Sequence, residues 1–315
     1  MPGGFLVPGH ATGAIEFVSL DGAAPVKLTT DKKNYFYHIT EWVDFNGDGR
    51  LDLLTARTTL NAETGEMLWL EQPATYTEGQ AWEEHHITDG PSVHFTIAEL
   101  DGDNSTIEII ACEFFDNRIS LIVINRNGGG LISRRVFDDT LGPAYMSQVV
   151  DLNGDGKLDI LATNHEKKEA DSHVYAYEIP EPSQWATAEF KRHVIASNFK
   201  PVKSMFVPQM APGFAYAMFP HKEIANTKGA RPHIVIAGDG DFSAWMMTPV
   251  GGVGSFEFER TLIKEEKGTV GSIALGDVTG NGFMDVLIPN YDKGYIELWQ
   301  CSEADEEPLK SSFLA

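Results

Sequence analysis

The sequence of 315 residues contains only two cysteines, Cys112 within an apolar run and Cys301 near the end, which form no ligand or disulfide framework. It also lacks any apolar run approaching the roughly 18 residues that a membrane span requires. The first segment, MPGGFLVPGHATG, has no Lys or Arg and only a short apolar run, so it does not resemble a secretory signal. These absences predict a cytoplasmic protein.

Basic residues are also scarce. The chain has 24 Lys and Arg against 46 Asp and Glu, which gives a formal net charge of −22. A surface with this excess of negative charge repels the phosphates of nucleic acids and of anionic membranes. We therefore expect neither nucleic acid nor membrane as a partner, and the composition does not indicate an oligomeric state.

The familiar catalytic signatures are missing as well. The chain has no G-x-S-x-G, no Walker loop, no complete G-x-G-x-x-G and no H-E-x-x-H motif. His85 and His86 are adjacent on a predicted outer strand, where consecutive side chains face opposite ways and cannot jointly hold one metal. Hydrolase, kinase and dinucleotide enzyme are therefore disfavoured, and no organic cofactor is predicted.

An acidic loop is present in two full copies, DFNGDGRLD at 44–52 and DLNGDGKLD at 151–159. Asp and Asn oxygens alternate, a glycine permits a sharp turn, the seventh residue can offer its carbonyl, and a carboxylate closes the loop. Hard cations such as calcium take six to eight oxygen ligands of this kind. A β-type run follows at once, so the loop is not an EF-hand.

Two weaker copies are DVTGNGFMD at 277–285 and DGDNSTIE at 101–108. We expect the loops to bind calcium, with magnesium as the alternative. We expect the ion to be structural, holding adjacent strands together, and not catalytic. The predicted ligands are Asp44, Asn46, Asp48, Arg50, Asp52, Asp101, Asp103, Glu108, Asp151, Asn153, Asp155, Lys157, Asp159, Asp277, Thr279, Asn281, Phe283 and Asp285.

The loops begin at residues 44, 101, 151 and 277, which indicates a repeat of about 50 residues. The last interval is about twice the others, and it predicts a degenerate copy around residues 222–231. Each repeat contains four short apolar runs, one entering the loop, one leaving it, an aromatic-rich third and a more polar fourth. Four strands per repeat without a long helical segment are typical of a β-propeller blade.

We therefore predict an all-β fold, a single β-propeller domain over residues 1–315 with about six four-stranded blades. Five and seven blades remain as alternatives. The N-terminal part supplies only three runs, FLVPGH, AIEFVSL and VKLTT, whereas SSFLA is available at the C-terminus. Joining the two ends would complete a sixth blade and remove exposed sheet edges.

The D-x-[DN]-G-D-G-x-x-D loop between the first two strands of each repeat resembles the FG-GAP or VCBS repeat of integrin-α-like propellers. The resemblance covers nearly the whole chain. It implies that the metal loops lie on the face opposite the usual ligand funnel. One such fold hosts many unrelated functions, so the resemblance bears mainly on the fold.

A second set of residues lies at equivalent ends of the predicted inner strands and would surround one mouth of the central channel. A concave site of mixed apolar and polar residues suits a small molecule. Taken singly, each residue also fits a strand-end or packing role. The predicted hydrogen-bond donors are Arg57, His94, His165 and Tyr291. The predicted substrate contacts are His10, Tyr37, His38, Phe95, Phe114, Tyr145, Asn164, Lys203, Asp239, Trp245 and Asn290.

Within the propeller family, the chain resembles fungal biosynthetic enzymes, and most closely the hetero-Diels-Alderases of tropolonic sesquiterpene pathways. That resemblance implies a cycloaddition between a tropolone quinone methide and a terpene such as humulene. Capturing both partners in one dry pocket would replace a bimolecular encounter. The alternatives are a lectin-like or protein-binding propeller without chemistry, and a scaffold.

Overall fold

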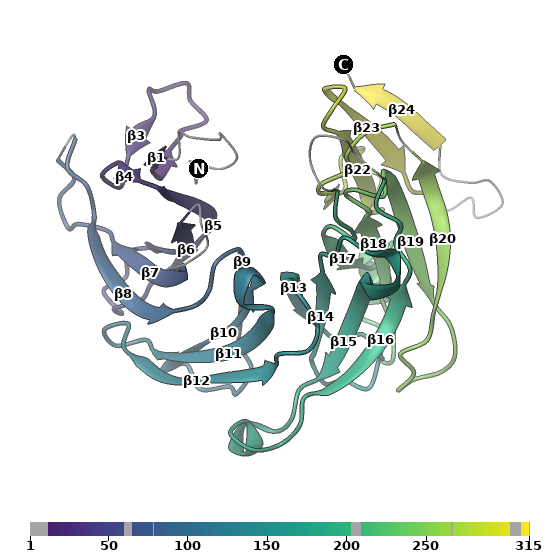
Figure 1. Ribbon diagram of the computed structural model, residues 1–315, viewed down its shortest axis with the longest axis horizontal. Helices are drawn as coiled ribbons and strands as arrows, with labels where there is room; N and C mark the ends of the chain where they lie inside the picture. The colour runs from purple at the N-terminus through teal and green to yellow at the C-terminus, as the bar shows by residue number, and fades with distance from the viewer. Residues whose placement is uncertain are drawn as a thin grey trace. The chain divides into compact units, whose positions relative to one another are not determined.

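The structure is a computed structural model that describes residues 12–59, 65–77, 79–202, 209–265 and 267–302, and the backbone of 310–314. Nearly all regular structure in these residues is β-strand, and the one α-helix is the short α1 (Lys222–Ala225). The prediction of an all-β chain is confirmed (Figure 1). Within this described part, no helix combines the length and the apolar composition needed to cross a bilayer.

The chain divides into two compact units, Met1–Thr140 and Leu141–Ala315. The first unit contains two four-stranded antiparallel sheets and two short two-stranded ones. The four-stranded sheets are β5(Tyr35–Val43), β6(Asp52–Thr59), β7(Gly65–Glu71) and β8(Glu83–Asp89), and β9(His94–Ala98), β10(Thr106–Glu113), β11(Arg118–Asn125) and β12(Leu131–Asp138). The short pairs are β1(Thr12–Gly13) with β4(Lys32–Lys33), and β2(Glu16–Phe17) with β3(Val26–Lys27).

The second unit contains three four-stranded sheets. They are β13(Ala144–Val150), β14(Asp159–Asn164), β15(His173–Glu178) and β16(Lys191–Ser197); β17(Ala215–Met218), β18(His233–Ala237), β19(Ser243–Pro249) and β20(Phe258–Glu265); and β21(Ala274–Gly276), β22(Asp285–Asn290), β23(Tyr295–Gln300) and β24(Lys310–Leu314). The helix α1 lies in the connection from β17 to β18, where the degenerate copy of the repeat was predicted.

In each four-stranded sheet, every strand pairs antiparallel with the strand next to it in sequence. Such meanders are the blades of β-propellers. The four acidic loops join the first strand of a sheet to its second, as predicted. The C-terminal strand departs from the prediction, because β24 pairs with β23 and completes its own sheet (Figure 1). The sequence predicted that this strand would instead join the N-terminal strands in one blade, and the described strands do not pair in that way.

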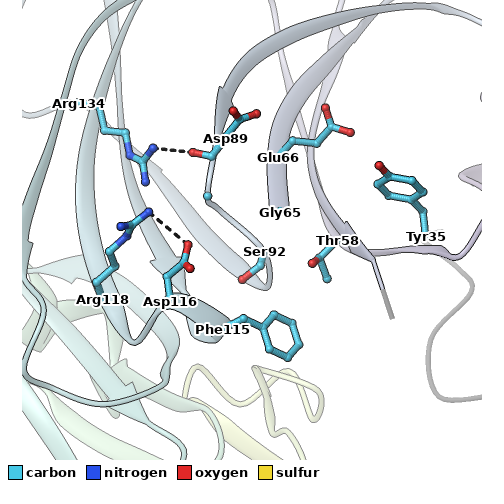
Figure 2. A pocket seen from close by; sticks show the side chains of 11 residues that line it. Tyr35, Thr58, Gly65, Glu66, Asp89, Ser92, Phe115, Asp116, Arg118 and Arg134 are labelled. Atoms are coloured by element: carbon cyan, nitrogen blue, oxygen red, sulfur yellow. Dashed lines mark hydrogen bonds and ion pairs between the residues drawn. The ribbon is translucent and has the colours of Figure 1, made fainter. Parts of the chain in front are cut away.

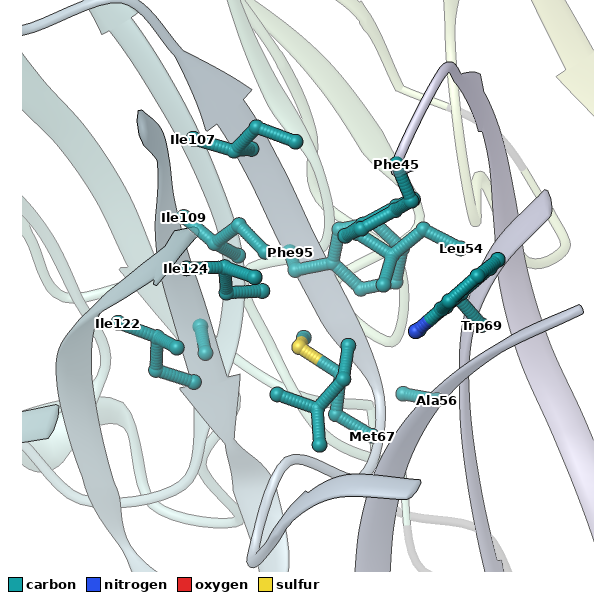
Figure 3. Close-up of a cluster of buried hydrophobic side chains, with 12 residues drawn as sticks. Phe45, Leu54, Ala56, Met67, Trp69, Phe95, Ile107, Ile109, Ile122 and Ile124 are labelled. Carbon is teal, nitrogen blue, oxygen red and sulfur yellow. The ribbon is translucent and has the colours of Figure 1, made fainter. Parts of the chain in front are cut away.

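Side chains that alternate along the strands fill the space between neighbouring sheets. In the first unit, Ile107 and Ile109 of β10 and Ile122 and Ile124 of β11 pack in one cluster with Phe95 (Figure 3). Residues two apart on a strand point to the same face, which is why alternate positions meet in the cluster. Burial of each such side chain contributes roughly 1.5–3 kcal/mol. A comparable cluster in the second unit joins β13–β16 to β17–β20.

Candidate functional site

The two full copies of the acidic loop share one pattern of internal hydrogen bonds. In the first loop, the two carboxylate oxygens of Asp44 accept from the amides of Gly47 (2.8 Å) and Gly49 (3.0 Å). The loop that begins at Asp151 repeats both bonds. Gly47 and Gly49 have φ angles of +73° and +83°, a region that glycine enters without strain. The repeated residues therefore build the same turn in both copies.

The acid that closes each loop is buried at the start of the second strand. Each accepts a hydrogen bond of 3.0 Å from a backbone N–H at the start of its loop: Phe45, Leu152 and Val278 follow the first acid, and Leu100 precedes it. Burial, with a smaller contribution from the charges of Asp155 and Asp151, raises the pKa of Asp159 to about 7. A divalent cation would offset this repulsion and would favour the ionised form. The closing acids are Asp52, Glu108, Asp159 and Asp285.

The loop with the weakest sequence pattern gathers its acids most closely. Carboxylate oxygens of Glu99, Asp101 and Glu108 lie within 4.8 Å of one another. Glu108 is fully buried, and its Oε1 has no hydrogen-bond partner. A buried carboxylate oxygen without a partner is costly unless a cation or a donor satisfies it. The residues present therefore fit a hard cation, and Glu99, which precedes the loop motif, was missed by the sequence pattern.

The structure also brings together three of the residues predicted to contact a small molecule, all in the second unit. Tyr145 lies on β13, His165 directly follows β14, and Asp239 follows β18. The rings of Tyr145 and His165 stack with centroids 4.2 Å apart. The Nε2 atom of His165 lies 3.8 Å from the Oδ2 atom of Asp239. We refer to these three residues as the Tyr-His-Asp cluster.

Backbone contacts hold the cluster in place. The Nδ1 atom of His165 lies 2.7 Å from the carbonyl oxygen of Pro212. Because a carbonyl only accepts, Nδ1 carries the proton and Nε2 presents its lone pair toward Asp239. Asp239 has a φ of +53°, and its amide donates to the carbonyl of Val270 at 2.9 Å. The orientation of both polar groups is therefore set before any ligand binds.

Burial separates the proton affinities of the cluster. It lowers the pKa of His165 to about 4, and it raises the pKa of Asp239 to about 7, with a further contribution from the charge of Asp241. It also raises the pKa of the Tyr145 hydroxyl above its ordinary value. Near neutral pH, the imidazole is therefore uncharged and the Asp239 carboxyl is protonated in about half of the molecules.

The first unit contains two histidines on the first strands of its two four-stranded sheets, His38 on β5 and His94 on β9. Burial lowers the pKa of each to about 4, and for His94 the neighbouring His38 contributes to the shift. Both were predicted as site residues. Their lowered pKa values make them neutral hydrogen-bonding groups near pH 7, and not cations.

Arg57 was predicted as a catalytic donor, but its guanidinium is held by neighbours within the first unit. Nε donates to Glu66 at 2.7 Å, while Nη1 donates to Glu84 at 2.8 Å and to the Tyr37 hydroxyl at 3.0 Å. Hydrogen bonds to these partners raise the pKa of Arg57 although burial opposes the shift. These bonds link Arg57 to Tyr37 and to two carboxylates of the same sheet.

Several other predicted contacts also have structural partners. Asn164 donates to the carbonyls of Leu141 and Asp171, both at 2.8 Å. The Trp245 indole donates to Asp241 at 2.9 Å, and its ring lies under the guanidinium of Arg260.

The remaining predicted residues are spread over different environments. Phe95 is in the core, Phe114 begins a 3₁₀ turn, and Asn290 accepts from the amide of Lys293 at 3.1 Å. Tyr291 is 81% exposed within the second unit. His10 and Lys203 lie outside the described residues.

Two aromatic residues beside the cluster were not predicted. Phe214 meets the Tyr145 ring edge to face at 5.1 Å, and Tyr216 stacks on Phe214. Neither residue lies in a motif, although the alternation F-A-Y in residues 214–216 places Phe214, just before β17, on the same side of the chain as Tyr216 within it. Together with Tyr145 they give the polar pair His165 and Asp239 an apolar aromatic flank.

Comparison with known proteins adds little to this picture. No protein-family model matches the sequence, and no curated protein matches it either. Among solved structures, the Dos1 propeller is similar with a TM-score of 0.45 and 7% sequence identity, over 88% of this chain. The chain spans 59% of the length of that propeller.

Proposed function

We propose that the protein is an enzyme that promotes the cyclisation of a largely apolar small molecule at the Tyr-His-Asp cluster. The observation that carries this proposal is the pairing of a neutral imidazole with a carboxyl of raised pKa, 3.8 Å apart, beside stacked aromatic rings. Perturbed proton affinities beside a specific polar partner are typical of catalytic groups. The aromatic flank suits an apolar substrate.

The reaction that we propose is a hetero-Diels-Alder cycloaddition between a tropolone quinone methide and a terpene such as humulene. In this reaction, negative charge develops on the heterodiene oxygen. The protonated carboxyl of Asp239 or the hydroxyl of Tyr145 would donate a hydrogen bond to that oxygen and stabilise the charge. His165 is a poor donor here, because its Nδ1 proton is committed to the carbonyl of Pro212.

The same residues can generate the quinone methide by dehydration of a hydroxymethyl tropolone. Asp239 would protonate the leaving hydroxyl, which departs as water, while His165 Nε2 would accept the proton of the ring hydroxyl. Return of that proton from His165 to Asp239 would restore both groups. The step consumes no oxidant and needs no organic cofactor.

We further propose that the five four-stranded sheets and the N-terminal strands form an FG-GAP-type propeller of about six blades, with calcium in the acidic loops. The repeated loop and its repeated hydrogen bonds support this architecture. The ion would be structural, because the loops belong to the connections within sheets and contribute no residue to the Tyr-His-Asp cluster.

The proposal is tested by incubating the purified protein with the hydroxymethyl tropolone and humulene and measuring the adduct by mass spectrometry. We expect Asp239→Asn to lower the rate about 100-fold, because it removes the acid but keeps the shape. Tyr145→Phe should lower the rate about tenfold if its hydroxyl donates to the same oxygen. Asp139→Asn, an exposed acid outside the cluster, is the matched control.

Two outcomes would contradict the proposal. One is an adduct that forms no faster than without protein, which would favour a binding module. The other is full activity of the Asp239→Asn protein, which would place the chemistry elsewhere in the chain.

A further inference from the structure

A pocket of about 400 Å³ lies in the first unit and shares no residue with the acidic loops or with the Tyr-His-Asp cluster. It is formed by the ends of β6 and β7, the turn after β8, the 3₁₀ turn η1 (Phe114–Asp116) and strands β11 and β12. Figure 2 shows Arg118 and Arg134 on one side of it, Glu66 and Tyr35 on the other, and Ser92 between them.

The base of the pocket is a rigid ionic network around Glu113, whose side chain is fully buried. One carboxylate oxygen of Glu113 accepts from Arg118 and from Arg134, both at 2.6 Å, and the other accepts from the hydroxyl of Ser120. Gly90 closes this layer with a φ of +113°, and a Cβ there would lie 2.6 Å from the carboxylate. The two guanidinium groups are therefore held in position without a ligand.

Two polar atoms at the pocket wall are buried and lack a hydrogen-bond partner, Ser92 Oγ and Arg134 Nε. Ser92 is only 2% exposed. A buried donor without a partner costs free energy that a bound polar group would recover. Both residues line the same pocket, so a ligand rich in hydrogen-bonding groups could satisfy these atoms after a small side-chain movement.

The charges on the wall indicate that this ligand is uncharged. Arg118 and Arg134 would repel a cation, whereas Glu66, Asp89 and Asp116 would repel an anion. A hydroxyl group donates to a carboxylate and accepts from a guanidinium, so adjacent hydroxyl groups satisfy both kinds of wall residue at once.

An aromatic ring is also available to such a ligand. Phe115 lines the pocket and is 39% exposed, so one face of its ring can cover the apolar C–H groups of a sugar. We propose that this pocket binds a neutral monosaccharide or disaccharide. The site is independent of the cyclisation proposed above, because it shares no residue with the Tyr-His-Asp cluster.

Titration calorimetry of the full chain with D-glucose, D-galactose, D-mannose, N-acetylglucosamine, lactose and cellobiose tests the proposal. We expect at least one of these neutral sugars to bind saturably. Glucuronate and glucosamine, which add a negative and a positive charge to the same ring, should bind at least about fivefold more weakly. L-Serine serves as the zwitterionic comparison and should not compete.

Two variants locate the site. Phe115→Ala should weaken sugar binding about tenfold, whereas Tyr76→Ala, which removes another exposed ring outside the pocket, should not change it. Ser92→Ala should weaken binding about fivefold and leave the unfolding midpoint unchanged or higher, because the hydroxyl has no partner within the protein.

Three results would overturn the proposal. They are the absence of saturable binding for all six sugars up to their solubility, tighter binding of glucuronate, glucosamine or L-serine, and unaltered affinity in both pocket variants.

Discussion

At the scale of the residue, burial shifts the pKa values of Asp239 and His165. The two groups lie 3.8 Å apart, yet desolvation moves the acid up to a pKa of about 7 and the base down to about 4. Both shifts favour the uncharged forms. Near neutral pH the resting pair therefore carries an uncharged imidazole beside a carboxyl that is protonated in about half of the molecules.

The raised pKa of Asp239 has a measurable effect on stability. The folded chain retains its proton up to about pH 7, whereas the unfolded chain releases it near pH 3.8. Between these values the folded state binds more protons, so this group's contribution to stability falls as the pH rises. We expect Asp239→Asn to stabilise the protein more at pH 7.5 than at pH 5, by about 1–3 kcal/mol, as measured by urea unfolding.

Asp139→Asn, at an exposed position, is the control and should show no such pH dependence. The charge of Asp241 contributes to the Asp239 shift, so Asp241→Asn should reproduce part of the effect. An equal effect of Asp239→Asn at both pH values would contradict the assignment.

At the scale of the element, the unit that repeats is two strands and the acidic loop between them. The first carboxylate of the loop accepts hydrogen bonds from backbone amides within the loop. The closing acid, on the second strand, accepts a hydrogen bond from an amide at the start of the loop. A cation bound by the remaining oxygens would stabilise the folded state by mass action. Its effect is therefore expected on stability and not on turnover.

We expect calcium to raise the melting temperature, and free calcium at 100 times its dissociation constant to add roughly 2.7 kcal/mol per site. Glu108→Gln should abolish the contribution of the Glu99, Asp101 and Glu108 site, because an amide cannot replace the buried carboxylate charge. Asp31→Ala, an exposed acid outside the loops, should behave as wild type. A melting temperature that calcium does not change, measured by scanning calorimetry after EDTA treatment, would count against metal in the loops.

At the scale of the whole molecule, the proposed closed propeller predicts that the two compact units unfold together. Ile109→Ala removes a fully buried side chain from the first unit and should cost about 2–5 kcal/mol. In a closed ring the whole chain should still melt in one cooperative transition, shifted to lower temperature. Leu161→Ala is the matched change in the second unit.

Scanning calorimetry distinguishes a closed ring from two units that unfold independently. Two resolved transitions, of which each variant shifts only one, would mean that the units are energetically independent and that the ring is not closed.

Local patterns were sufficient to predict the strands and their loops. The D-x-N-G-D-G turns and the alternation of apolar residues operate over a few neighbouring positions, so they can be read directly from the chain. The doubled interval between loop starts predicted a degenerate copy around residues 222–231, and that segment does connect the first two strands of a sheet. The sequence did not predict the pairing of β24 with β23, because one short apolar segment can pair equally well with several different strands.

The sequence by itself determined the repeat, the strand order within each sheet and the candidate residues at strand ends, because these depend on neighbours along the chain. Only the tertiary structure decided which candidates lie together. Tyr145, His165 and Asp239 meet from three different strands or strand ends, while Arg57 is bound by two carboxylates. Burial, partner distance and charge depend on contacts between residues far apart in the sequence, and those contacts decide proton affinity and reactivity.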